Sequence, residues 1–231
     1  MGKVEVSGGA IRIDGKPVQM ISGTIHYFRV HPELWRDRIE KAKMMGLNAI
    51  ETYLCHNLHE PHKGEFDFSG MLDFERFLDE IHRAGLYAIV RPGPYICAEW
   101  ENGGLPPWLS VEPGIDFRCS NPAFLEANDL NKVLPMVKKH LYTAGGPVVM
   151  MQIENEYCSY GKDRNYLEHI RQVYLRNGID VPLFTSDGPC DWMLHGGTIP
   201  ECYQTLNFGS RSEEAFRKGR EYRPEGPDFC M

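Results

Sequence analysis

Two acids and an amide follow a short apolar run near the middle of the chain. Residues 148–153 are apolar except for Gln152, and Glu154, Asn155 and Glu156 come directly after them. This profile is typical of a buried strand whose last residues enter a polar cavity. Because side chains alternate along a strand, Glu154 and Glu156 would lie on one side and Asn155 on the other. Asn155 and Glu156 can serve one site only if the regular strand ends or bulges here.

A carboxyl group at this place has two interpretations. Burying a carboxyl group is costly unless it is hydrogen-bonded or takes part in the chemistry of a site. The alternative is a structural ion pair with an arginine at the rim, because such pairs also perturb acids. The residues elsewhere in the chain distinguish these two interpretations.

Other acids and several aromatic side chains also lie near the ends of apolar segments. The candidate acids are Glu51, Glu60, Glu99, Glu101, Glu154 and Glu156, and the aromatic residues are Tyr53, Tyr95, Trp100, Trp108 and Tyr157. Together they suit a sugar, whose C–H face stacks on rings while its hydroxyls hydrogen-bond to carboxylates and amides. Each acid could instead form a loop salt bridge, and each ring could pack beneath the loops.

Three histidines three residues apart suggest a metal site, but the segment does not favour one. His56, His59 and His62 have a spacing that zinc sites use, yet Pro61 and Lys63 indicate a turn rather than one helix face. No metal is therefore predicted.

The sequence gives little support to a serine or cysteine nucleophile, or to a dinucleotide-binding site. Ser22 and Ser186 are not in a Gly-x-Ser-x-Gly elbow, and no histidine near Cys97 in the sequence could activate its thiol. A packed thiol in a pocket wall is the better interpretation of Cys97. No Gly-x-Gly-x-x-Gly motif opens a helix after a strand, so a dinucleotide-binding sheet is disfavoured.

The elements that position these residues alternate between strands and helices. The chain begins with two strands around an Asp14-Gly15 turn, the second running on toward Ile25. Strands are then expected at residues 48–53, 87–90, 148–153, 181–185 and 205–208, and helices at 32–45, 74–81, from 121–122, and at 130–141, 166–174 and 212–218. This alternation indicates a parallel α/β fold, either a barrel or an open sheet. The polar residues that gather after successive strands favour a barrel.

Composition and charge restrict the class of protein. The 231 residues are 42% hydrophobic and 25% charged, which is ordinary for a globular protein. A net charge of -7 argues against nucleic acid and anionic membranes as partners, and no apolar run is long enough for a membrane helix. The first residues form no hydrophobic signal region, so we expect a cytoplasmic protein of bacterial origin.

The seven cysteines are odd in number, irregularly spaced and without a C-x-x-C pair. Free thiols in a reducing compartment are expected, with a disulfide between Cys190 and Cys202 left open.

Several motifs in this order resemble glycoside hydrolase family 35, the β-galactosidases. They are residues 21–29 (ISGTIHYFR), 51–53 (ETY), 57–61 (NLHEP), 91–106 (RPGPYICAEWENGGLP) and 152–157 (QIENEY). The resemblance covers residues 15–231. It implies one domain, residues 1–231, that is an incomplete (β/α)8 TIM barrel of about six and a half β/α units after a short N-terminal β-hairpin.

The resemblance also implies a retaining exo-β-galactosidase acting on terminal β-galactose of an oligosaccharide or glycoconjugate. Glu156 would be the acid/base residue, and Asn155 would contact the sugar beside the reacting carbon. Four further positions would line the galactose pocket: Tyr53, Cys97, Ala98 and Glu99. A retaining mechanism needs two carboxyl groups about 5–5.5 Å apart, and Glu156 must carry a proton when the leaving group departs.

The nucleophile of this family lies on the seventh strand, and the chain stops in the approach to it, residues 227–231 (PDFCM). We therefore expect the nucleophile to be absent and the chain to be inactive alone. His56 and Cys158 stand where the family commonly has Trp and Gly. The alternatives are a retaining exo-glycosidase for glucose or glucosamine, and a non-catalytic galactose-binding barrel. The sequence does not indicate an oligomeric state.

Overall fold

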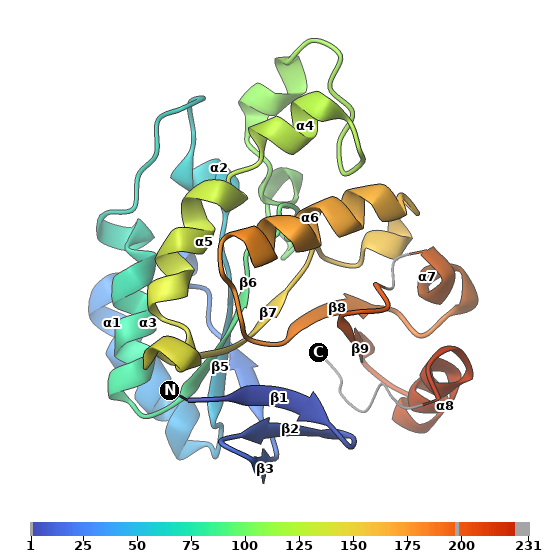
Figure 1. Ribbon diagram of the computed structural model, residues 1–231. Coiled ribbons are helices and arrows are strands. Elements are labelled where there is room, and N and C mark those ends of the chain that lie inside the picture. Colours follow the sequence, from blue (N-terminus) through green and yellow to red (C-terminus); the bar gives the residue numbers. More distant parts are fainter. Residues whose placement is uncertain (1, 197–198, 225–231) are drawn as a thin grey trace.

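The computed structural model describes residues 2–196 and 199–224, which form two sheets and a layer of helices (Figure 1). The larger sheet has six parallel strands in sequence order, each paired with the next. They are β4 (Ser22–Thr24), β5 (Ala49–Tyr53), β6 (Tyr87–Arg91), β7 (Val148–Gln152), β8 (Leu183–Asp187) and β9 (Tyr203–Leu206). The predicted parallel α/β fold is confirmed as an incomplete (β/α)8 barrel. The half unit expected at residues 227–231 lies outside the described residues.

The smaller sheet is antiparallel and holds the N-terminal segment. Its strands are β1 (Val4–Ser7), β2 (Ala10–Ile13) and β3 (Lys16–Val18). The predicted turn is confirmed, since Ile13 pairs with Lys16 around Asp14 and Gly15, both with positive φ (50° and 77°). A two-residue hairpin turn of this kind requires positive φ at both positions. The sequence did not reveal β1, so the expected hairpin is part of a three-stranded sheet.

The expectation that the second strand continues to Ile25 is wrong. β3 ends at Val18, and residues 22–24 form β4 of the other sheet. The side chain of Asn48 explains the break, because it donates to the carbonyl of Gln19 (2.7 Å) and accepts from the N–H of Ile21 (2.8 Å). The amide thus satisfies the backbone where the chain passes between sheets.

The principal helices follow the strands as predicted. These are α1 (Pro32–Met44), α3 (Phe74–Arg83), α4 (Pro122–Ala127), α5 (Leu130–Lys139), α6 (Arg164–Arg176) and α8 (Ser212–Tyr222). Asn121 caps α4 as expected, since its Oδ1 accepts from the N–H of Phe124 (3.1 Å). The sequence did not predict α2 (His56–His59) or α7 (Asp191–Gly196), which are too short for a periodic pattern.

Short 3₁₀ turns complete the connections. They are η1 (Tyr27–Arg29), η2 (Gly70–Leu72), η3 (Glu101–Gly104), η4 (Pro107–Val111), η5 (Tyr142–Ala144) and η6 (Tyr157–Ser159). Two of them, η3 and η4, divide the long loop expected between residues 95 and 120, and η6 follows the focal acids.

The helices cover one face of the parallel sheet, and the small sheet covers part of the other. Apolar side chains of α1, α3, α5 and α6 form one buried cluster with Ile50, Val90 and Met151 of the strands. A second cluster joins the small sheet to the opposite face of β6, β7 and β8. Its buried members are Val4, Ile11, Ile13, Ile89, Val149, Met150 and Phe184. The small sheet thus packs against β6, β7 and β8 on the side away from the helices and lies below the amino ends of the strands in Figure 1, whereas the polar residues lie at their carboxyl ends.

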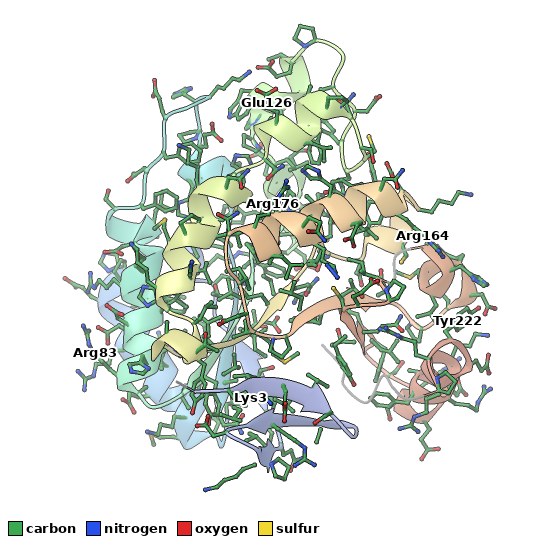
Figure 2. The ribbon with its side chains drawn as sticks, viewed as in Figure 1. Lys3, Arg83, Glu126, Arg164, Arg176 and Tyr222 are labelled. Carbon is green, nitrogen blue, oxygen red and sulfur yellow. The ribbon has the colours of Figure 1, made fainter. Side chains whose placement is uncertain are left out.

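Charged side chains on the helices point outward, as Arg83, Arg164 and Arg176 show (Figure 2), and all three are exposed. The disulfide left open between Cys190 and Cys202 is not formed. Both are free thiols, as are Cys55, Cys97, Cys119 and Cys158, whereas Cys230 lies outside the described residues.

Candidate active site

The regular strand β7 ends at Gln152, before the focal acids. Glu154 and Glu156 both adopt left-handed backbone conformations, with φ of 58° and 43°. Such conformations are uncommon for residues other than glycine and need support from neighbouring structure. Here the N–H of Glu154 donates to the carbonyl of Gly93 (3.1 Å), and that of Glu156 to Ser186 (3.2 Å). The strand alternation that would separate Asn155 from Glu156 is therefore interrupted.

Glu154 is a structural carboxylate. It is buried, and Arg118 donates to both its oxygens, at 2.8 and 3.3 Å. The hydroxyl of Tyr166 donates to it as well (2.6 Å). Burial lowers the pKa of Arg118, but the Glu154 carboxylate more than offsets this and raises that pKa above its usual value, so the guanidinium stays charged. Of the two interpretations offered for these acids, the ion pair with an arginine is correct for Glu154.

Asn155 lies at the centre of a buried hydrogen-bond network. Its Oδ1 accepts from Arg91 (2.7 Å), from the hydroxyl of Tyr53 (3.1 Å) and from Gln152 (3.4 Å). Arg118 donates to its backbone carbonyl (2.7 Å). Because the side-chain oxygen is engaged in this way, the amide N–H groups are the part of Asn155 available to a ligand.

Tyr53 lies between this network and the other predicted site residues. The guanidinium of Arg91 lies 4.2 Å from the centre of its ring, and Arg91 also pairs with Glu51 (2.6 Å). Burial raises the pKa of the Tyr53 hydroxyl well above its usual range. The guanidinium of Arg91 lowers this pKa, and the neighbouring groups Glu51, Cys97 and Glu156 raise it. The structure thus brings Tyr53 together with Asn155 and within electrostatic reach of Cys97 and Glu156.

The ring of His26 packs beside that of Tyr53 in a tilted arrangement, with ring centres 5.1 Å apart. Burial lowers the pKa of His26 to about 4, and the charges of Arg29 and Arg91 lower it as well. The ring is therefore neutral at pH 7 and adds no positive charge to this wall of the site.

Glu156 is half-buried and has a direct partner on its carboxyl group. Asn207, immediately after β9, donates its side-chain N–H to Oε1 of Glu156 at 2.5 Å. At the end of β8, burial raises the pKa of Asp187 to about 6, and the charge of Glu156 also raises it. Asp187 accepts from the N–H of Cys158 (3.3 Å) and so fixes the turn that follows Glu156.

The loop at residues 97–99 is fixed through its backbone. Cys97, Ala98 and Glu99 have φ of 57°, 56° and 45°, and Arg29 donates to the carbonyls of Ala98 and Glu99. Ala98 is buried and Cys97 half-buried, whereas the side chain of Glu99 is exposed. The structure therefore orders the backbone of this loop, but it does not bring the Glu99 carboxylate into the network around Asn155.

The histidines suggested as metal ligands have structural partners instead. His59 hydrogen-bonds to the hydroxyl of Tyr27 and to the carbonyl of Asp67, and burial lowers its pKa to about 4. His56 hydrogen-bonds to Glu60 at 2.6 Å. In residues 2–196 and 199–224, no cluster of three histidine, cysteine or acidic residues is arranged to hold a metal ion.

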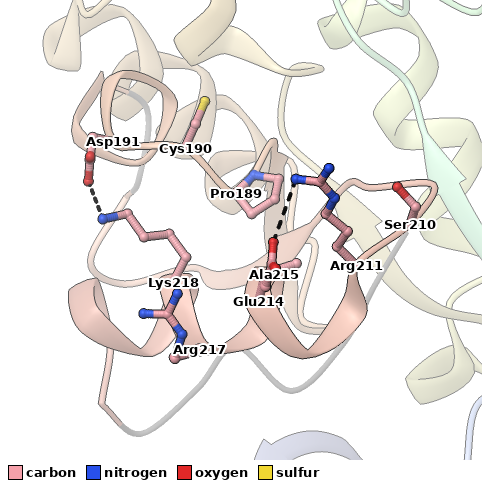
Figure 3. A pocket seen from close by; sticks show the side chains of 9 residues that line it. All are labelled: Pro189, Cys190, Asp191, Ser210, Arg211, Glu214, Ala215, Arg217 and Lys218. Carbon is pink, nitrogen blue, oxygen red and sulfur yellow. Dashed lines mark ion pairs between the residues drawn. The ribbon is translucent and has the colours of Figure 1, made fainter.

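A separate cavity of about 420 Å³ lies between α7 and α8 (Figure 3). Its charged residues form ion pairs with one another, including Lys218 with Asp191 (2.6 Å) and Arg211 with Glu214 (3.8 Å). Because its cations are paired with acids, this cavity presents no concentrated charge to a ligand.

Sequence reasoning did not identify Arg118 or Asn207. Arg118 comes from the irregular loop after β6, where no periodicity marks it. Asn207 directly follows β9, whose sequence Tyr-Gln-Thr-Leu is not an apolar run, and it fell inside the strand expected at residues 205–208. No helix in the described part of the chain has the length and apolar character needed to cross a membrane.

Comparison with known proteins gives a consistent result. Residues 10–231 match the profile of Glycosyl hydrolases family 35. The chain is 45% identical to a beta-galactosidase of Mus musculus, across 97% of this chain and 36% of that protein, and 46% identical to one of Homo sapiens, across 98% and 34%. It spans about a third of the length of these curated relatives.

Solved structures agree on the fold alone. The exo-beta-1,4-mannosidase Op5Man5 from Opitutaceae bacterium strain TAV5 has a TM-score of 0.64 at 16% identity, covering 87% of this chain and 40% of that one. GH5_18 from Streptomyces cattleya, in complex with GlcNAc, has a TM-score of 0.58 at 9% identity, covering 73% and 44%.

One expectation has to be corrected. The sequence suggested a cytoplasmic protein of bacterial origin, but the relatives at 45–46% identity are mammalian, so the bacterial assignment is wrong and the compartment inferred with it has no support. The strand-end position of the site, the profile match over nearly the whole chain and the identity to these relatives lead to one conclusion: the chain belongs to glycosyl hydrolase family 35.

Proposed function

We propose that this chain carries the proton-donating half of a retaining exo-β-galactosidase site. The substrate is a terminal β-galactose of an oligosaccharide or glycoconjugate, and neither nucleic acid nor a membrane is a partner. The observation that supports this most is the grouping of Glu156, Asn155 and Tyr53 at the carboxyl ends of β5 and β7. The carboxyl end of the strands is where barrels of this kind carry their chemistry.

In the first half of the reaction Glu156 is the acid. Its carboxyl group transfers a proton to the glycosidic oxygen while the bond between that oxygen and the anomeric carbon breaks. A second carboxylate forms a bond to the anomeric carbon at the same time. In the second half Glu156, now ionised, removes a proton from water, and the water attacks the anomeric carbon to release galactose and the second carboxylate.

The remaining residues bind and orient the sugar. Asn155 donates its amide N–H groups to a sugar hydroxyl beside the reacting carbon, since its oxygen is already bound by Arg91 and Tyr53. The loop of Cys97, Ala98 and Glu99 forms another wall of the pocket, and the exposed Glu99 carboxylate accepts from sugar hydroxyls once the sugar covers it. Carboxyl groups perform both steps, so no cofactor is needed.

The second carboxylate belongs to the seventh strand of the barrel. The described sheet ends at its sixth strand, β9. Glu51 and Glu154 are unsuited to the role because each is paired with a buried arginine.

The test compares the complete product of the reading frame with its Glu156→Gln variant, using aryl β-galactosides with good and poor leaving groups. Loss of the acid should slow the poor leaving group about 10²–10⁴-fold and the good one much less. Added azide should restore turnover by attacking without a general base. Matched aryl β-glucosides and glucosaminides serve as controls, and faster turnover of either would reject the galactosidase assignment. Equal rates of the parent and the variant on the poor leaving group would reject Glu156 as the acid.

A further inference from the structure

Asn207 makes a contact that joins two distant parts of the chain at the candidate site. Its Nδ2 lies 2.5 Å from Oε1 of Glu156, although the two residues are 51 positions apart. The backbone N–H of Asn207 donates to the carbonyl of Asp187 (2.9 Å), which fixes the start of the segment after β9. The amide therefore approaches Glu156 from the neighbouring end of the sheet, across the end of β8.

The direction of this hydrogen bond restricts where a proton can lie on Glu156. The side-chain NH₂ of asparagine is only a donor, so an O–H on Oε1 would point at the hydrogen of the amide. The proton of the acid form therefore belongs on Oε2. With Oε1 held by the amide, Oε2 is the oxygen that gives up the proton in the first half-reaction and regains one from water in the second.

The other groups around Glu156 are accounted for. Tyr53 on β5 has a neutral hydroxyl. Glu154, which lies on the same segment as Glu156, is paired with Arg118. Asp187 on β8 is a buried acid that accepts from the backbone of Cys158, whose own thiol is neutral because burial raises its pKa. Asn207 is thus the neutral group that acts directly on the Glu156 carboxyl from β9.

We infer that Asn207 is a positioning residue for the proton donor: it fixes Oε1 of Glu156 so that Oε2 delivers and removes the proton. This inference rests on the proposed function. Asn207 is exposed, so replacing it should not affect the hydrophobic core, and a merely structural residue at this place would not change the protonation of Glu156.

The experiment follows the titration of the Glu156 carboxyl carbon in the ¹³C-glutamate-labelled 231-residue chain, assigned with Glu156→Gln. Asn207→Ala removes the donor and should move the titration midpoint up by about 0.5–1 pH unit. Asn207→Asp places a second carboxylate at the same distance, so the midpoint should rise further and the curve should become biphasic. Asn131→Asp, an exposed asparagine on α5, is the matched control and should leave the midpoint unchanged.

The outcomes separate the two proposals. Midpoints in Asn207→Ala and Asn207→Asp equal to the parent value, with unchanged melting temperatures, would overturn the role of Asn207. Galactose binding is measured on the same samples by ligand-observed NMR. If galactose binds and the titration midpoint of Glu156 is the same in the parent and in both Asn207 variants, the proposed function is retained and the positioning role is rejected. If the titration midpoint of Glu156 changes in the Asn207 variants but galactose does not bind, the hydrogen bond is confirmed in solution. The sugar chemistry is then rejected, and the positioning role is rejected with it.

Discussion

Arg118 and Glu154 form a buried ion pair at 2.8 Å between the loop after β6 and the segment after β7. The same arginine donates to the carbonyl of Asn155 (2.7 Å) and lies 3.9 Å from the centre of the Tyr95 ring. One guanidinium thus connects the loop that precedes α4 to Glu154 and to the backbone of Asn155, which is expected to contact the sugar. This pair is the structural support of the candidate site.

Replacing Arg118 with alanine should destabilise the protein by about 3–5 kcal/mol, because the buried Glu154 would lose its ion-pair partner. Urea unfolding of the chain would measure the loss. The double variant Arg118→Met, Glu154→Gln is the control, since it removes both charges together and should recover a large part of that stability. A single variant as stable as the parent would contradict the role given to this pair.

The glycine at position 103 should be intolerant of a side chain. A Cβ at Gly103 would lie 1.9 Å from the Tyr95 ring, and its φ of 57° is unfavourable for alanine. We expect Gly103→Ala to cost about 2–4 kcal/mol and to displace Tyr95 from Arg118. Gly114→Ala is the matched control, because Gly114 also has positive φ (72°) but an added Cβ meets nothing within 4 Å. Equal melting temperatures for the two variants would show that overpacking at Gly103 is unimportant.

Tyr53→Phe should weaken galactose binding without unfolding the chain. The variant keeps the ring beneath Arg91 and loses the hydroxyl that donates to Asn155. One neutral hydrogen bond corresponds to about 0.5–1.5 kcal/mol, or roughly a 2–10-fold loss of affinity by calorimetry. Tyr160→Phe removes an exposed hydroxyl bonded to the carbonyl of Phe117 and should bind galactose like the parent. An unaffected Tyr53→Phe affinity would place Tyr53 outside the sugar site.

Asp187 should make stability decrease as the pH rises. Burial raises its pKa in the folded chain to about 6 from a model-peptide value of 3.8. A raised carboxyl pKa favours the folded state below pH 3.8, and this stabilisation disappears as the pH rises through 6. Asp187→Asn should therefore be more stable relative to the parent at pH 7 than at pH 4, by about 2 kcal/mol. Chemical unfolding at both pH values measures this difference, and parallel pH profiles would refute it.

The 231-residue chain alone should bind galactose but not hydrolyse galactosides. One carboxyl group of the pair that a retaining mechanism needs is proposed to lie on a strand after β9. Discontinuous assays with an aryl β-galactoside, with the Glu156→Gln chain as the blank, test this. Turnover above that blank would mean that another acid of the chain is the nucleophile.

The sequence predicted the parallel strands and the longer helices because their apolar residues are periodic, as in α3 and α6. It failed at positions set by contacts between distant segments. Asn48 ends the second strand of the hairpin, Arg118 approaches from an irregular loop, and Asn207 reaches Glu156 from the end of β9. None of these contacts leaves a periodic signal, because each depends on residues far away in the chain. The roles of Glu156 and Asn155 remain predictions that rest on their motif and position.

The small N-terminal sheet has a consequence for how the polypeptide becomes compact during synthesis. Val4, Ile11 and Ile13 form one buried cluster with Ile89, Val149 and Phe184 of the parallel strands. All six residues precede the end of β8, so a growing chain holds every partner of this contact before β9 has been made. The packing of β6, β7 and β8 against the N-terminal sheet therefore does not require a closed barrel.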